Sequence, residues 1–280
     1  MSLGTPEDVK AFRRLLLERS GLILSADKDY LLKSRLQPIA RAEGRPDVAT
    51  LLRQVRLDPT GALAQRCIEG MATHESFFFR DNTPFDQLRD VILPQLWAAR
   101  AKSKTLRILS SACSSGQEPY SLAMLLQEDR ARFGDWKIEI LATDLSQPIL
   151  DRARTGLYSD FEVRRGLTDE RRRRWLVREG EAFRVAASLR AMVQFRRHNL
   201  LDGMAALGRF DLVLCRNVLI YFDQPTKART LAAIAQSLSP DGLLILGSAE
   251  TVVGLGGAFE PTPGLRGVFR TKQAVERAVA

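Results

Sequence analysis

Residues 106–127 read LRILSSACSSGQEPYSLAMLLQ, and this stretch decides the fold. Its first part, 106–110, is a short apolar run with the length of a buried strand, whereas 119–127 has the apolar spacing of a helix. Between them lies a turn of small residues, 111–118, and the proline that follows suits the first turn of a helix. The stretch therefore predicts a strand, a tight turn and a helix.

Strands and helices continue to alternate along the chain. Further strands are predicted at 138–142, 210–215, 243–246 and 268–270, and helices from about Ser146 and over 223–238. A turn at 239–242 separates the last helix from its strand, and the strand at 268–270 can be antiparallel. Such alternation implies an α/β fold with a parallel, doubly wound sheet and right-handed crossovers.

The first hundred residues have a different pattern. Residues 9–70 carry apolar side chains at helical spacing and predict a small all-α bundle, and a further helix is predicted over 83–96. The predicted domains are an N-terminal helical domain at 1–72, a linker with a connecting helix at 73–100, and the α/β domain at 101–280.

The basic segment 156–198 interrupts the alternation of strands and helices. It contains short β-like pieces at 183–185 and 192–195, and we interpret it as a small β-subdomain inserted on the sheet. Its arginine run, 171–174, is typical of the solvated face of a helix.

Composition limits the class of protein. The chain has 280 residues, 45% of them hydrophobic, which supports a folded core. No apolar run approaches the roughly 20 residues of a membrane span, and Glu7 and Asp8 lie where a secretory signal would be basic, so we expect a cytoplasmic protein without membrane insertion.

Cys67, Cys113 and Cys215 match no zinc spacing and are expected to be reduced and buried. The net charge of +9 would attract a nucleic acid, an anionic membrane or an acidic protein, and charge alone does not choose among them.

Ligands of doubly wound sheets bind outside the carboxyl ends of the strands, so the turns there are candidate binding loops. The turn at 111–118 lacks the G-x-G-x-x-G pattern of dinucleotide sites, which favours a nucleoside without pyrophosphate, such as S-adenosylmethionine. Asp144, after the second strand, can accept hydrogen bonds from ribose hydroxyls or can cap the following helix. Glu118 can bind the amino group of a methionyl moiety or can complement the helix dipole.

Two further segments carry candidate site residues. The turn after the strand at 210–215 places Arg216 and Asn217 at the sheet edge, followed by Tyr221, for which a core position is the usual alternative. The segment 73–81 places three aromatic residues beside Arg80, and such aromatics are more often core than part of a ligand site.

Together these segments resemble the chemotaxis receptor methyltransferases, the CheR family. The resemblance spans essentially the whole chain and depends on residues 75–81 (ESFFFRD), 112–121 (ACSSGQEPYS), Asp144 and 215–222 (CRNVLIYF). The chain departs from the family pattern at His74, where Asn is usual, at Ser76, where Thr is common, and at Gln117, which replaces a common Glu.

The resemblance implies a cofactor, a substrate and a set of binding residues. The cofactor is S-adenosylmethionine, without a metal, and the methyl acceptors are glutamate side chains in the cytoplasmic region of methyl-accepting chemoreceptors. We expect a monomer that binds no nucleic acid. The residues implied to line the cofactor site are His74, Ser76, Arg80, Glu118, Asp144, Asn199, Leu200, Arg216 and Asn217.

Some members of the family capture a C-terminal receptor pentapeptide by adding it as a strand to the inserted subdomain. Those members tend to carry a glycine-rich extension in a loop of this subdomain. The corresponding loop here, 178–183, is short. We therefore expect activity that does not depend on such a pentapeptide.

The expected chemistry needs no general base, because a glutamate carboxyl has a reference pKa of about 4.3 and is already ionised at neutral pH. We expect direct displacement, in which Arg80 anchors the cofactor and helps to orient the reacting groups. Tyr221 is expected to aim the substrate carboxylate through a hydrogen bond. These two residues are the predicted catalytic pair.

Two other classes of function stay open from the sequence. A nucleic-acid methyltransferase would share the fold and the basic charge, but Asn217 is followed by Val218 and Leu219 rather than by two prolines and an aromatic residue, and Cys215 lacks the preceding proline of a cytosine-attacking thiol. A non-catalytic module that binds the cofactor and signals through a partner is the second alternative.

Overall fold

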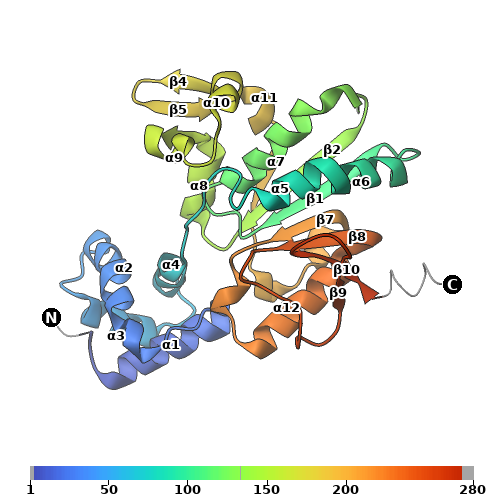
Figure 1. Ribbon diagram of the computed structural model, residues 1–280. Helices are drawn as coiled ribbons and strands as arrows, with labels where there is room; N and C mark the ends of the chain where they lie inside the picture. The colour runs from blue at the N-terminus through green and yellow to red at the C-terminus, as the bar shows by residue number, and fades with distance from the viewer. Residues whose placement is uncertain (1–2, 133, 273–280) are drawn as a thin grey trace. The chain divides into compact units, whose positions relative to one another are not determined.

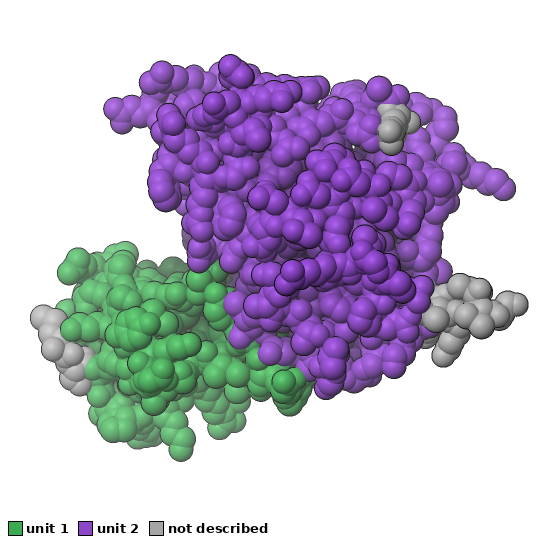
Figure 2. Space-filling model, viewed as in Figure 1, with its two compact units in different colours: residues 1–73, 221–226 green, residues 74–220, 227–280 purple. Residues whose placement is uncertain are grey.

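The computed structural model describes residues 3–132 and 134–272 of the chain. It divides into two compact units, one formed by residues 1–73 with 221–226 and the other by residues 74–220 with 227–280 (Figure 2). The predicted domain boundaries stay a prediction, and residues 133 and 273–280 of the predicted last domain lie outside the described part.

The first unit is built from the helices α1 (Pro6–Ser20), α2 (Asp29–Ala42), α3 (Val48–Leu57) and α4 (Ala62–Met71) with the short turn η1 (Ala26–Lys28) (Figure 1). Helix α1 begins with a capping box in which Thr5 Oγ1 accepts a hydrogen bond from Asp8 N. It ends at Gly21, whose φ of 75° suits glycine; a Cβ there would lie 3.0 Å from the Phe222 ring. The returning segment 221–226 thus packs closely on the end of α1.

Within the described residues, the second unit contains a seven-stranded sheet in the order β6-β2-β1-β7-β8-β10-β9. The neighbours from β6 to β8 are parallel, and β10 is antiparallel to both β8 and β9, so the α/β doubly wound expectation is confirmed with a mixed edge. The strands are β1 (Thr105–Ser111), β2 (Lys137–Asp144), β6 (Val193–Arg197), β7 (Phe210–Cys215), β8 (Leu238–Leu246), β9 (Phe259–Pro261) and β10 (Val268–Thr271).

Helices connect and cover these strands. They are α5 (Thr83–Gln87), α6 (Leu93–Ala99), α7 (Gln117–Glu128), α8 (Gln147–Thr155) and α12 (Gln224–Ser237), with the short 3-10 turns η3 (Arg130–Arg132), η4 (Leu200–Asp202), η5 (Ala205–Leu207) and η6 (Leu219–Tyr221). The helix predicted over 83–96 is not uniform: α5 and α6 are joined by one π-helical turn, η2 (Leu88–Ile92). Pro94 explains this, because proline has no N–H for the regular helical bond.

The inserted segment forms its own small sheet. The described strands β3 (Leu157–Ser159), β5 (Ala182–Val185) and β4 (Leu176–Glu179) pair antiparallel in the order β3-β5-β4. The helices α9 (Asp160–Arg164), α10 (Asp169–Trp175) and α11 (Ala187–Arg190) surround them (Figure 1).

Two details of the sequence prediction are wrong. The sequence predicts the β-like piece at 192–195 as part of the insertion, but β6 pairs parallel with β2 in the main sheet. The turn at 239–242 does not separate a helix from a strand, because Leu238 already pairs with Phe210 and the irregularity lies inside β8. In both cases the partner strand decides, and a partner strand is not visible in a run of a few residues.

The three cysteines are free and buried, as expected. Burial raises the pKa of the Cys67 thiol to about 12 and raises those of Cys113 and Cys215 well above the usual range. No helix among the described residues is long and apolar enough to span a membrane.

Asp211 in β7 joins three parts of the sheet. Its Oδ2 accepts a hydrogen bond from the main-chain N–H of Arg107 in β1 at 2.8 Å, and its Oδ1 accepts one from Arg100 Nε at 2.8 Å. Arg100 also pairs with Asp241 in β8, and the Asp241 side chain is 52% exposed whereas that of Asp211 is 9% exposed.

We expect Asp211→Asn to lower the free energy of unfolding by about 1–3 kcal/mol, because the amide replaces one buried accepting oxygen with a donor that faces another N–H. Asp241→Asn, which touches the same arginine from solvent, should cost less than about 1 kcal/mol. Urea titration followed by circular dichroism measures both. Equal losses would contradict the role of burial.

Candidate functional site

The predicted site residues of the second unit gather at one edge of its sheet. Asp144 is the last residue of β2, Glu118 lies in the first turn of α7 after β1, and Arg216 follows β7 directly. Asn199 lies in the turn after β6. Because β6, β2, β1 and β7 are parallel neighbours, their carboxyl ends place these side chains along one edge, where doubly wound folds bind ligands.

The loop between β1 and α7 holds a strained main chain. Ala112, Ser114 and Gly116 have φ angles of 54°, 53° and 93°. A Cβ on Gly116 would lie 3.0 Å from Ala153 Cβ and 3.1 Å from the Tyr158 hydroxyl, so only glycine fits. Strain of this kind persists where the surroundings impose it, and it is common at ligand sites.

Asp144 ties this loop to the turn after β2. It is 6% exposed, its Oδ2 accepts a hydrogen bond from Ser114 N at 2.9 Å, and its Oδ1 accepts one from Ser146 N at 3.0 Å. The alternative that Asp144 caps the next helix is wrong, because the cap residue of α8 is Ser146. Each carboxylate oxygen has a second lone pair, so Asp144 can still accept hydrogen bonds from a ligand.

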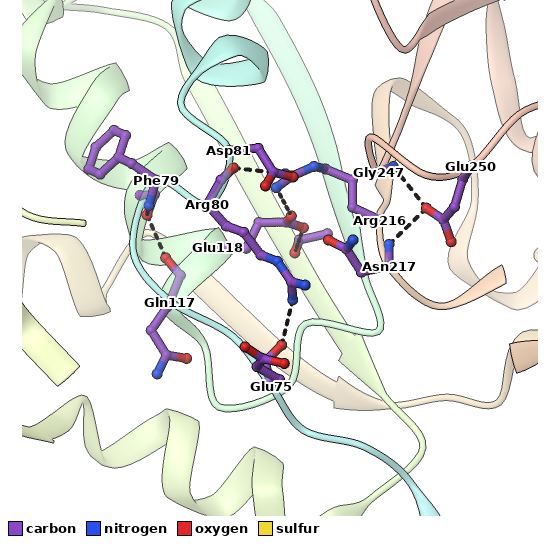
Figure 3. Close-up of polar contacts among 12 residues, drawn as sticks. Glu75, Phe79, Arg80, Asp81, Gln117, Glu118, Arg216, Asn217, Gly247 and Glu250 are labelled. Atoms are coloured by element: carbon purple, nitrogen blue, oxygen red, sulfur yellow. Dashed lines mark hydrogen bonds and ion pairs between the residues drawn. The ribbon is translucent and has the colours of Figure 1, made fainter. Parts of the chain in front are cut away.

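Arg216 is the centre of the polar network. Its side chain is 1% exposed, and its Nη1 donates to Glu118 Oε2 at 2.9 Å while its Nη2 donates to Asp81 Oδ2 at 2.8 Å and to the carbonyl oxygen of Arg80 at 2.7 Å (Figure 3). The other oxygen of Glu118 accepts a hydrogen bond from Ser110 Oγ at 2.8 Å. A buried guanidinium paired in this way joins the loops after β1 and β7 to the segment at 80–81.

Glu250 is a residue of this polar network that the sequence does not single out. It lies in the turn after β8, and its carboxylate accepts hydrogen bonds from the main-chain N–H groups of Asn217 and Gly247, both at 2.8 Å (Figure 3). A third comes from the N–H of Val218 at 3.0 Å. Glu250 thereby holds Asn217 at a φ of 59°. The signal was a carboxylate that follows a strand, the same signal that identified Asp144.

The segment at 74–81 lies beside these loops. Phe78 and Phe79 are 0% and 3% exposed, so for these two aromatics the core interpretation is correct. The half-buried Phe77 lies near the Arg80 guanidinium, at 5.5 Å from the ring centroid. Arg80 Nη1 donates to the carbonyl oxygen of Glu75 at 2.7 Å (Figure 3).

The other predicted site residues differ in burial and in the compact unit to which they belong. His74 and Ser76 are half-buried, Leu200 is buried, and Asn199 Oδ1 accepts a hydrogen bond from Leu201 N at 3.1 Å. Tyr221 belongs to the first unit, where its carbonyl oxygen accepts a hydrogen bond from Ile23 N at 3.0 Å, whereas the other predicted site residues belong to the second.

The loops fit a nucleoside that carries an amino acid. The hydroxyl oxygens of Ser111 and Ser114 are buried and have no hydrogen-bond partner among the described residues, so they can pair with a ligand. Glu118 and Asp144 supply acceptors, and the loop has no run of glycines that would cradle a pyrophosphate. No group of three or more His, Cys, Asp or Glu side chains in the described part could hold a metal ion.

Removing the Glu250 carboxylate should release the loops after β7 and β8. In Glu250→Ala we expect the amides of Asn217, Val218 and Gly247 to exchange with solvent at least about tenfold faster, because each loses a charged hydrogen-bond acceptor worth about 1.5–3 kcal/mol. Hydrogen exchange read by mass spectrometry or NMR measures this. Glu260→Ala is the control, since Glu260 pairs with the Arg270 side chain; unchanged exchange in Glu250→Ala would refute the role of this carboxylate.

Two family models match consecutive parts of this chain. A model described as the SAM binding domain of CheR methyltransferase matches residues 74–268, and one described as the all-alpha domain of CheR methyltransferase matches residues 7–71. The chain is 38% identical over 252 residues to chemotaxis protein methyltransferase Cher2 of Pseudomonas putida, covering 89% of this chain and 91% of that protein. It is also 38% identical over 272 residues to chemotaxis protein methyltransferase 1 of Pseudomonas aeruginosa, covering 95% and 98%.

A solved glycopeptide N-methyltransferase, MtfA in complex with S-adenosylmethionine, aligns with 70% of this chain and 69% of its own at 17% identity and a TM-score of 0.35. Both values are too low to indicate a shared function. The two family models, by contrast, match in order and together span most of the chain. This protein therefore belongs to the CheR methyltransferase family, with the family's all-alpha domain followed by its S-adenosylmethionine-binding domain.

Proposed function

We propose that this protein transfers a methyl group from S-adenosylmethionine to glutamate side chains in the cytoplasmic region of chemoreceptors, forming methyl esters. The observation that supports this most is the arrangement of Glu118, Asp144 and Arg216 around a small-residue loop, in a chain of the CheR family. The relatives in Pseudomonas are named chemotaxis protein methyltransferases, which agrees with such a substrate.

The binding residues have distinct tasks in this proposal. Asp144 accepts hydrogen bonds from the ribose hydroxyls, and Glu118 faces the positive amino group of the methionyl moiety. Arg80, Arg216 and Asn217 complete the wall of the site, together with His74, Ser76, Asn199 and Leu200. When bound, S-adenosylmethionine supplies an electrophilic methyl group on a sulfonium.

The protein contributes positioning and no proton transfer. The acceptor carboxylate is ionised at neutral pH and is already nucleophilic. Holding two reacting groups in line can supply roughly 7–11 kcal/mol in favourable cases. Arg80 orients the reacting groups and Tyr221 donates a hydrogen bond that aims the acceptor carboxylate, so the reaction is a direct displacement without a covalent enzyme intermediate.

In this proposal the receptor surface is acidic, and electrostatic attraction brings it to the basic protein. A net charge of +9 favours the approach of an acidic receptor surface in the cytoplasm. Only Gly180 and Glu181 lie between β4 and β5, and this short turn lacks a glycine-rich extension. We therefore propose that a monomer acts without a C-terminal receptor pentapeptide.

The decisive experiment incubates the protein with methyl-labelled S-adenosylmethionine and receptor-containing membranes, followed by treatment with base. Glutamate methyl esters release volatile labelled methanol, whereas methylated bases and amines do not. Membranes without receptors are the control. Label that resists base, or no label in the receptor, would exclude carboxylate methylation.

The catalytic pair can be separated by single substitutions. Tyr221→Phe should lower kcat by about tenfold to a hundredfold with unchanged cofactor affinity, because the acceptor loses its orienting hydrogen bond. Arg80→Ala should lower both turnover and cofactor affinity. Calorimetry and steady-state kinetics measure these effects, with Tyr30→Phe as a control because Tyr30 is 66% exposed. Normal turnover and affinity in both variants would contradict the assigned roles.

A further inference from the structure

Two arginines of the inserted subdomain stack on the aromatics of the segment at 75–80. Arg165, at the end of α9, donates from Nη2 to Glu75 Oε1 at 2.9 Å, and its guanidinium lies 4.2 Å from the Phe77 ring centroid. Arg171, in α10, lies 3.8 Å from the Phe79 ring centroid. Each arginine thus covers one ring of the segment that carries Arg80.

Arg171 also forms an ion pair with Glu128. Its Nε and Nη2 donate to the two oxygens of Glu128 in α7, both at 2.8 Å, and its side chain is 21% exposed. The interpretation of 171–174 as a wholly solvated face is therefore wrong for this residue. The Arg171 guanidinium points inward because it stacks on Phe79 and pairs with Glu128.

The main chains also meet at this point. Gly166 has a φ of 101°, and a Cβ there would lie 1.8 Å from the carbonyl oxygen of Phe78. Only glycine allows the loop between α9 and α10 to approach the segment so closely. The contact is therefore built into the backbone and does not depend on side chains alone.

Arg165 and Arg80 contact the same two residues, Glu75 and Phe77, although they bond to different oxygens of Glu75. Arg80 Nη1 donates to the Glu75 carbonyl oxygen at 2.7 Å, and the Arg80 guanidinium lies 5.5 Å from the Phe77 centroid. Phe77 thus lies near both guanidiniums. The hydrogen bond from Arg165, with a smaller effect of the Arg80 charge, lowers the pKa of the Glu75 carboxyl and keeps it ionised.

We propose that Arg165 is a positioning residue for the cofactor site: through Glu75 and Phe77 it holds the Arg80 guanidinium in its binding pose, with Arg171 fixing the same segment at Phe79. The inserted subdomain thereby fixes the conformation of the segment at 75–80. This inference rests on the proposed role of Arg80.

The ion pair between Arg165 and Glu75 should contribute little to the free energy of folding. The side chains of Arg165 and Glu75 are 43% and 58% exposed, and ion pairs this exposed contribute little to folding. The effect of the Arg165 side chain should therefore appear in ligand affinity rather than in the melting temperature.

The test measures the affinity of the full-length protein for S-adenosylhomocysteine by calorimetry, beside its melting temperature. Arg165→Ala should weaken binding roughly three- to tenfold, the scale of one cation–π contact and one charged hydrogen bond. Arg165→Lys, which keeps the charge, should recover part of the affinity. Arg178→Ala is the matched control, since this exposed arginine of the same subdomain bonds to the Gly180 carbonyl oxygen.

A double-mutant cycle separates positioning from general damage. If Arg165 acts through Arg80, Arg165→Ala should have little further effect in an Arg80→Ala background. Unchanged affinity in Arg165→Ala, or the same loss with and without Arg80, would overturn the inference. Because the readout needs no methyl acceptor, a wrong receptor substrate would not affect it; unchanged affinity in Arg80→Ala alone would instead refute the assigned role of Arg80 and the inference with it.

Discussion

The site depends on one buried charge, the guanidinium of Arg216. With 1% of its side chain exposed, it must find its counter-charges inside the protein, because an isolated buried charge costs several kcal/mol. It finds them in Glu118 and Asp81, which come from two different segments of the chain. The pairing therefore locks the loop after β1, the loop after β7 and the segment at 80–81 into one arrangement.

Carboxylates support the strained loops around this charge. Asp144 accepts main-chain N–H groups from the loop after β1 and from the turn after β2, and Glu250 does the same for the turns after β7 and β8. Positive φ angles at Ser114 and Asn217 persist because these acceptors compensate for the strain. A preformed loop of this kind loses less conformational entropy when a ligand binds.

The sequence predicted the elements that have a strong local pattern. The strand at 106–110 and the helix at 119–127 are found as β1 and α7, with boundaries that differ by one or two residues. The sequence places β6 in the wrong sheet because its partner strand β2 is distant along the chain, whereas Glu250 carries the local signal of a carboxylate that follows a strand. The π-helical turn before Pro94 could have been anticipated from that proline, whereas the inward position of Arg171 could not.

The sequence by itself determined the family, the order of strands and helices, and the residue types at the sheet edge, because apolar periodicity and short motifs are local properties of the chain. Only the tertiary structure decided which groups meet. Arg216 and Glu118 are 98 residues apart and Arg165 and Glu75 are 90 apart. The folded chain brings these groups to within hydrogen-bond distance, whereas the sequence around one charged residue does not indicate its distant partner.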